Sequence, residues 1–220
     1  MITSTPITPV ALTPPMALAL ASNFGSVERW VAEVDALVNA HDAAGGEVRL
    51  VFDPRSGALS NRWASTAGAP GTLITLFAIP LPATPDDLLA RLDWPLAYQR
   101  YQDAVHAASD RFAAHDIAGM QVLDVRRAGV FATASTMLPG AVWHDPAAVA
   151  AWAPQLAVDR PVLVYCVYGH EVGRVTAMRL QALGVEARFL VGGIDKWQRA
   201  GRATVAKAPG AAGTAPLTRR

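Results

Sequence analysis

One stretch, RPVLVYCVYGHEVGR at residues 160–174, constrains the fold of this chain more than any other. Residues 162–164 form a short apolar run of the kind that builds a buried strand, and Gly169 marks a turn soon after it. Residues 172–183 then carry apolar side chains at the spacing of one helix face. The stretch therefore predicts a strand, a tight loop and a helix, with Cys166 at the carboxyl end of the strand.

A cysteine in this position faces the unpaired N–H groups and the positive dipole end of the helix that follows. Both favour the thiolate over the thiol. We therefore expect Cys166 to have a pKa below the value of about 8.5 for a free thiol, and to serve as a nucleophile or to line an anion site. The alternative is that Cys166 is a small core residue that ends the strand, because buried cysteines are common.

The composition of the chain limits the classes of function. With 220 residues, 52% of them hydrophobic, the chain can form one domain with a large extension or two small domains. Lysine and arginine number 19 against 18 aspartates and glutamates, so we expect no nucleic-acid or membrane partner. A single cysteine excludes an internal disulfide and a cysteine-cluster metal site. We expect a reduced thiol, no metal and a cytoplasmic location.

The first 25 residues hold four prolines among small and polar residues without a sustained period. We therefore expect residues 1–25 to form an irregular arm. The segment PPMALALASNFG has some features of a signal peptide, which makes export the alternative to a cytoplasmic location. No lysine or arginine precedes Arg29, however, and prolines interrupt the apolar part, so we do not favour export.

Residues 26–82 are predicted to form a small α+β unit. Ser26 can cap a helix that runs to about Ala40, and the apolar runs at residues 48–52 and 72–79 predict strands. The unit has no spacing typical of a metal site, a phosphate loop or a catalytic triad. The sequence therefore assigns it no function.

A cluster of prolines follows the second of these strands, and residues 83–203 are predicted to form the main domain. Thr84 can start a short helix, and Pro95 can occupy the first position of a longer helix that runs to about Ala114. His106 lies on that helix without the spacing of a ligand pair. We therefore leave it out of the candidate site.

From Gln121 onward strands and helices alternate. The strand QVLD leads to a turn-rich connection, a helix from about Ala147, the strand before Cys166, its helix, a strand at residues 187–190 and the turn GGIDKW. This alternation implies a parallel sheet that is covered by helices on both faces. Residues 204–220, rich in alanine, proline, glycine and threonine, are predicted to be a disordered tail.

Four landmarks in this order, DVRR, PGA, YCVYGHEVG and GGIDKW, resemble the rhodanese family of sulfurtransferases over roughly residues 84–201. YCVYGHEVG with DVRR upstream is also similar to rhodanese modules in bacterial proteins linked to chromate resistance. The resemblance implies a compact α/β fold with a parallel sheet between helices, and a catalytic cysteine that opens a six-residue loop. Residues 1–82 resemble no family that we identify.

The resemblance implies sulfur transfer in two steps, without a metal or an organic cofactor. Cys166 would accept a sulfane sulfur from thiosulfate or a persulfide donor, become a persulfide, and pass the sulfur to cyanide or a thiol. A protein persulfide is a further possible partner. Asp124 and Arg126 match the family's Asp-Val-Arg element, and the resemblance implies that they pair and hydrogen-bond so as to brace the strand end beside the loop. The residues expected around the substrate are Val167, Tyr168, Gly169, His170, Glu171 and Val172.

Two alternatives stay open. Phosphatases and arsenate reductases share the implied fold but require Cys-x5-Arg, and the sixth position after Cys166 is Val172. A non-enzymatic persulfide carrier or interaction module is the second alternative, because a basic residue often stands in the family where this chain has Glu171. A carboxylate there opposes a dianion, so we expect thiosulfate to be a poorer donor than a less charged persulfide, unless Glu171 turns outward.

Overall fold

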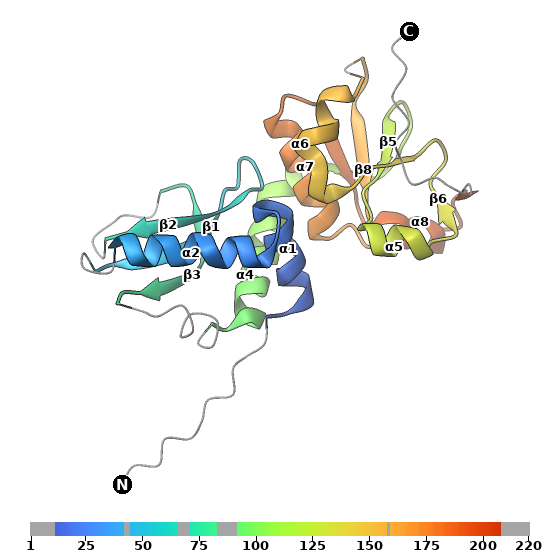
Figure 1. Cartoon of the computed structure of the whole chain (residues 1–220). Coiled ribbons are helices and arrows are strands. Elements are labelled where there is room, and N and C mark those ends of the chain that lie inside the picture. Colours follow the sequence, from blue (N-terminus) through green and yellow to red (C-terminus); the bar gives the residue numbers. More distant parts are fainter. Residues whose placement is uncertain (1–11, 42–44, 66–70, 83–91, 158, 208–220) are drawn as a thin grey trace. The chain divides into compact units, whose positions relative to one another are not determined.

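The computed structural model describes residues 12–41, 45–65, 71–82, 92–157 and 159–207 (Figure 1). The chain divides into two compact units, one of Met1–Asp53 with Leu59–Tyr101 and one of Pro54–Ala58 with Gln102–Arg220. The division falls inside helix α4 (Trp94–Ser109), later in the chain than the proline cluster. Whether a fragment from residue 83 folds alone stays a prediction.

In its described residues the first unit contains helices α1 (Pro14–Phe24) and α2 (Val27–His41), the first part of α4, and a three-stranded antiparallel sheet. The strand order is β2 (Leu59–Ala64), β1 (Glu47–Phe52) and β3 (Ile74–Pro80). The helix after Ser26 and both predicted strands are confirmed. Ser26 caps α2, because its hydroxyl accepts a hydrogen bond of 3.1 Å from the N–H of Arg29.

Helix α1 corrects the prediction of an irregular arm. Pro14 and Pro15 stand at the first two helical positions, where the N–H group that proline lacks has no partner inside the helix. Met16, Ala19 and Leu20 follow at spacings of three and four residues and are buried. Four prolines suggested an irregular segment, but two of them start a helix. Residues 1–11 of the predicted arm lie outside the described residues.

Strand β2 was missed in the sequence because LSNRWA is largely polar. It pairs along its length with β1, from Phe52 opposite Leu59 to Glu47 opposite Ala64. The buried Asn61 accepts a hydrogen bond of 3.0 Å from the indole N–H of Trp30. A buried polar residue with a partner from another element breaks the apolar alternation that identifies a strand.

Helix α4 ends earlier than predicted. The hydroxyl of Ser109 donates a hydrogen bond of 2.6 Å to the carbonyl oxygen of Val105, and a short 3-10 turn (Asp110–Phe112) follows. The chain then forms strand β4 (Ala113–Ala114), where a continued helix to Ala114 had been expected. The helix predicted from Thr84 lies outside the described residues.

The second unit confirms the predicted fold class. Its five parallel strands lie in the order β4, β9 (Ala187–Leu190), β8 (Val162–Tyr165), β5 (Gln121–Asp124) and β7 (Val142–Trp143). Helices α5 (Ala128–Thr133), α6 (Val149–Trp152), α7 (Glu171–Ala182) and α8 (Gly193–Arg199) complete this α/β unit (Figure 1).

The central strand β8 shows why both faces of the sheet are covered. All four of its residues are fully buried. Val162 and Val164 pack in one apolar cluster with residues of α7, and Leu163 and Tyr165 pack in a second cluster with residues of α8. Because successive side chains of a strand point to opposite faces, an unbroken apolar run requires a helix on each side.

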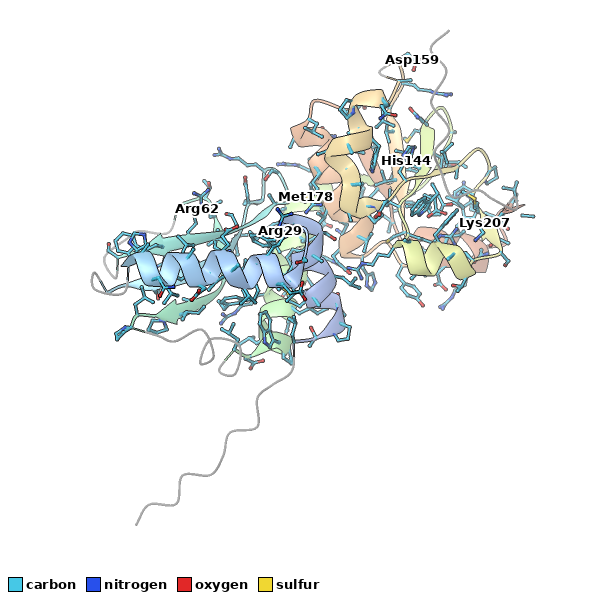
Figure 2. The ribbon with its side chains drawn as sticks, viewed as in Figure 1. Arg29, Arg62, His144, Asp159, Met178 and Lys207 are labelled. Atoms are coloured by element: carbon cyan, nitrogen blue, oxygen red, sulfur yellow. The ribbon has the colours of Figure 1, made fainter. Side chains whose placement is uncertain are left out.

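Part of the predicted tail is ordered by pairing. Strand β10 (Val205–Ala206) pairs antiparallel with β6 (Thr136–Met137). The ammonium group of Lys207 donates hydrogen bonds of 2.6 and 2.8 Å to the carbonyl oxygens of Phe131 and Ala132 near the end of α5 (Figure 2). A cation at a helix C-terminus is favourable for the helix dipole. Residues 208–220 lie outside the described residues.

Candidate active site

Cys166 directly follows β8 at the carboxyl edge of the parallel sheet, and 5% of its surface is exposed. The chain then turns through a short loop and enters α7 at Glu171. His170 is the N-cap residue of α7 and its side chain makes no capping hydrogen bond. The first N–H groups of the helix therefore remain available to the loop. The predicted order of strand, loop and helix is confirmed.

Opposing influences act on the pKa of the Cys166 thiol. Burial is the largest and raises the pKa, and the carboxylate of Glu171 raises it further. Backbone N–H groups of Gly173, Gly169 and Tyr168 hydrogen-bond to the sulfur and lower the pKa. The net direction is upward, so the prediction of a depressed pKa was wrong. The N–H donors can be inferred from the sequence, but the depth of burial, and with it the cost of removing a thiolate from water, cannot.

A double-glycine turn at the start of α8 holds the first part of the loop. The N–H groups of Ile194 and Asp195 donate hydrogen bonds of 3.0 Å to the carbonyl oxygens of Cys166 and Val167, respectively. Gly193 has φ +57°, and a Cβ atom there would lie 2.4 Å from the Val167 oxygen and 2.5 Å from the Cys166 oxygen. No side chain fits this position, which explains the glycines of the GGIDKW landmark.

Arg174 of α7 holds the second part of the loop. Its Nε atom donates a hydrogen bond of 3.0 Å to the carbonyl oxygen of Gly169. Its Nη1 atom bonds to the Ser109 hydroxyl at 3.0 Å and to the Asp110 carboxylate at 2.6 Å. The guanidinium also lies 4.3 Å above the ring of Phe189. These contacts of Arg174 could not be predicted from the sequence, because Ser109 and Asp110 are distant from it in the chain.

Asp124 ends β5 and is fully buried. Its carboxylate accepts hydrogen bonds of 3.0 Å from the backbone N–H of Arg126, 2.5 Å from the Nη2 of the same residue, and 2.8 Å from the Tyr165 hydroxyl. Arg126 also donates to the carbonyl oxygen of Thr136 at 2.9 Å. The predicted pairing of Asp124 with Arg126 is confirmed. Because Tyr165 directly precedes Cys166, the network connects two strand ends beside the sulfur.

Glu171 is buried, so the alternative in which it turns outward was wrong. Its Oε1 atom lies 3.5 Å from Nη2 of Arg127, whose side chain is 26% exposed. The carboxylate is close enough to the sulfur to raise the pKa of Cys166. The sequence reasoning missed Arg127 as a site residue. The only signal for it is the second arginine of DVRR.

Tyr168 and His170 are the exposed side chains of the loop. Their ring centroids lie 5.8 Å apart, and the ring of His170 lies 6.2 Å from that of His106 on α4. Burial lowers the pKa of His106, and the charges of Arg174 and His170 act in the same direction. His106 was left out of the candidate site because nothing in its local sequence indicates a contact with the loop.

The two valines among the predicted loop residues are placed differently. Val167 is half-buried and its carbonyl oxygen accepts the hydrogen bond from Asp195. Val172 packs against the apolar cluster that includes Val164 and Ala177. The side chain of Val172 therefore belongs to the core beneath the loop.

Comparison with known proteins identifies the class to which this site belongs. Residues 105–200 match the family model for the rhodanese-like domain. That part of the chain is a rhodanese-like domain, as its sequence landmarks predicted.

Solved structures similar to this chain include a rhodanese-related protein from Thermoplasma volcanium, with 22% identity, a TM-score of 0.36, and coverage of 40% of this chain and 86% of that chain. A thiosulfate sulfurtransferase from Pseudomonas aeruginosa is 26% identical, with a TM-score of 0.35. The match covers 40% of this chain and 16% of that chain. A curated superoxide dismutase [Fe] from Cupriavidus metallidurans is 49% identical over 47 residues, or 21% of this chain. The chain spans 24% of the length of that relative.

The described residues contain no group of three or more histidine, cysteine, aspartate or glutamate side chains placed to hold a metal ion. None of the helices in the described ranges has the length and apolarity needed to cross a membrane.

Proposed function

We propose that this chain is a sulfurtransferase that carries a sulfane sulfur on Cys166. The observation that carries the proposal is the set of N–H groups of Tyr168, Gly169 and Gly173 that hydrogen-bond to the sulfur of Cys166 within a rhodanese-like domain. Such donors stabilise negative charge on sulfur, whether on a thiolate or on a persulfide. Cys166 must stay reduced for this role, which fits a cytoplasmic setting.

In the first step, the Cys166 thiolate attacks the outer sulfur of thiosulfate or of a persulfide. A bond forms between Sγ and that sulfur, the S–S bond of the donor breaks, and its electron pair leaves with sulfite or with the donor thiolate. In the second step, cyanide or an acceptor thiolate attacks the outer sulfur, and the electron pair of the Sγ–S bond returns to Cys166. Electrons balance in each step, so neither requires an oxidant or a reductant.

Because the pKa of Cys166 is raised, the first step requires deprotonation of the thiol. The resting site favours the neutral thiol, which must lose its proton before it attacks. The N–H donors then bind the charged sulfur, while Asp124, Arg126 and Arg174 hold the loop in position without contacting the substrate. Asp124 and Arg126 are therefore positioning residues in this proposal.

A persulfide carrier is the second candidate function. The buried carboxylate of Glu171 lies close to the sulfur and disfavours a dianionic donor, so a site that exchanges sulfur with protein persulfides is consistent with the same geometry. We do not propose a phosphatase, because the sixth position after Cys166 is Val172 and the guanidinium of Arg174 already binds Gly169, Ser109 and Asp110.

The test is thiocyanate formation from thiosulfate and cyanide by the full chain and by Cys166→Ser. We expect turnover in the wild type and none in the variant, with matching thermal unfolding curves to show that the variant is folded. Turnover that persists in Cys166→Ser would exclude the mechanism. A wild type without turnover that still accepts sulfur from a persulfide would favour the carrier.

A further inference from the structure

The loop is surrounded by three guanidinium groups that differ in how fully their donors are used. Arg126 binds the Asp124 carboxylate and the Thr136 carbonyl oxygen. Arg174 binds a carbonyl oxygen, a hydroxyl and a carboxylate. Within the described part of the chain, the side chain of Arg127 forms one hydrogen-bonded ion pair, with Glu171 at 3.5 Å. A guanidinium has five N–H donors, and of the three groups Arg127 therefore has the most donors left for a ligand.

The contact between Arg127 and Glu171 is also loose. A charge-assisted N–H···O bond is usually about 2.7–2.9 Å long, and this pair is separated by 3.5 Å. Glu171 is buried, yet from the residues that the structure describes its carboxylate accepts one hydrogen bond, where a carboxylate can accept about four. Both members of the pair thus have unused hydrogen-bonding capacity beside the sulfur.

We propose that Arg127 and Glu171 select a zwitterionic amino thiol, such as cysteine, as the sulfur acceptor. The carboxylate of the acceptor binds the Arg127 guanidinium, its ammonium group binds the Glu171 carboxylate, and its thiolate attacks the outer sulfur of the Cys166 persulfide. The inference rests on the proposed function, because it concerns the second step of that reaction.

Charge complementarity favours this class over simpler ions. A dianion gains from Arg127 but is repelled by Glu171, and an amine gains from Glu171 but is repelled by Arg127. A ligand with one charge of each sign gains from both members of the pair. An α-amino acid head group is small enough to meet two side chains that are themselves in contact.

The chemistry of the step is complete without another reactant. The acceptor thiolate forms a bond to the outer sulfur, the Sγ–S bond breaks, and its electron pair becomes the Cys166 thiolate. The product is a small-molecule persulfide that carries the same head group as the acceptor. The outer sulfur is transferred from Cys166 to the acceptor without net oxidation or reduction.

The experiment measures kcat/KM with thiosulfate as donor and four acceptors: cysteine, cysteamine, 3-mercaptopropionate and 2-mercaptoethanol. Each value is divided by that for 2-mercaptoethanol, which has neither charge, and the ratios are compared between wild type and variant. The intrinsic reactivity of each thiol is the same with wild type and variant, so it cancels when their ratios are compared. Arg188→Gln and Glu186→Gln, from an exposed pair with a contact of 3.7 Å, serve as matched controls.

We expect Arg127→Gln to lower the ratios for cysteine and 3-mercaptopropionate about tenfold, and the ratio for cysteamine not to fall. Glu171→Gln should lower the ratios for cysteine and cysteamine, and Arg127→Lys should restore part of the loss seen in Arg127→Gln. Ratios that match those of the two controls would overturn the inference while leaving a functional Cys166 persulfide. Failure to form any persulfide would overturn the proposed function, and the inference with it.

Discussion

The backbone N–H of Ile194 donates a hydrogen bond of 3.0 Å to the carbonyl oxygen of Cys166. This bond joins the start of α8 to the start of the loop that surrounds the sulfur, two segments that are separated by α7 and β9. It depends on the close approach that Gly193 allows. The geometry of the candidate site is therefore fixed as much by the turn before α8 as by the loop itself.

Replacing Gly193 tests this dependence. Gly193→Ala should lower the free energy of unfolding by about 1–3 kcal/mol through backbone strain alone, and the contacts of 2.4 and 2.5 Å should also displace the loop and reduce sulfur transfer. Gly119→Ala is the matched control, because Gly119 also has positive φ, +73°, but no atom within 4 Å of its Cβ position. Equal effects of the two substitutions on activity would show that the close approach does not matter.

The buried carboxylate of Asp124 should matter for stability more than for chemistry. Asp124→Asn removes the charge from a site where Arg126 and Tyr165 donate to it, so we expect a loss of about 3 kcal/mol in unfolding free energy. The rate of sulfur transfer per folded molecule should change less. Asp116→Asn, at a 65% exposed side chain paired with Arg202, should leave the denaturation midpoint nearly unchanged, because solvent screens an exposed ion pair. An unchanged denaturation midpoint for Asp124→Asn would contradict the bracing role.

The raised pKa of Cys166 predicts the pH dependence of its alkylation. The rate of reaction with iodoacetamide should be slow at neutral pH and should still be rising at pH ~9, because a free thiol has a pKa of about 8.5. Glu171→Gln removes a charge that raises the pKa and should move the profile to lower pH. A profile that reaches its plateau below pH 8 would contradict this environment.

The raised pKa of Cys166 also predicts how the free energy of unfolding varies with pH. A thiol whose folded-state pKa lies above its unfolded value stabilises the folded protein fully below the unfolded pKa. That contribution is lost as the pH rises through the folded-state pKa. Denaturant unfolding of the wild type should therefore show an alkaline loss of stability that Cys166→Ser lacks. Parallel alkaline profiles for the two proteins would contradict the shift.

Glu171 should also make thiosulfate a poor donor. Glu171→Gln is expected to raise kcat/KM for thiosulfate several-fold more than for a persulfide donor, because a lower pKa of Cys166 helps both donors whereas the loss of repulsion helps mainly the dianion. The gain should shrink at high ionic strength, because salt screens the interaction of the carboxylate with the dianion. Thiosulfate kinetics that stay the same in Glu171→Gln and in Glu171→Arg would place the carboxylate beyond the reach of the donor.

Two fragments test the domain prediction and the role of the C-terminal strand. A fragment from Pro82 to Ala203 is predicted to fold alone, and one from Pro82 to Lys207 should melt at a higher temperature. The longer fragment keeps β10 and the hydrogen bonds of Lys207 to the carbonyl oxygens of Phe131 and Ala132. Identical melting temperatures would show that the C-terminal strand adds no stability, and molten behaviour of both would contradict the predicted domain.

The parallel sheet and the position of Cys166 could be predicted because their signals are local. The apolar run at β8 and the glycines after it are visible within a few residues of the sequence. Strand β2 could not be predicted in the same way, because Asn61 is buried through a partner on α2, far away in the chain. Pro14 and Pro15 at the start of α1 were misread, because proline is tolerated in the first turn of a helix although it breaks a helix interior.

The candidate site shows the same limit. The loop residues and the pairing of Asp124 with Arg126 followed from motifs, but the roles of Ser109, Asp110 and Arg127 depend on contacts between distant segments. The direction of the Cys166 pKa was wrong for a related reason. The N–H donors can be inferred from a loop before a helix, whereas the depth of burial depends on the packing of the whole unit.

The central claim is that Cys166 carries the transferred sulfur. Mass spectrometry of the full chain, before and after incubation with a persulfide donor, tests this most directly. We expect one sulfur atom to be added to the peptide that contains Cys166, to be lost when cyanide or a thiol is added, and not to be added in Cys166→Ser. A wild-type protein whose mass stays unchanged with every donor would contradict the account.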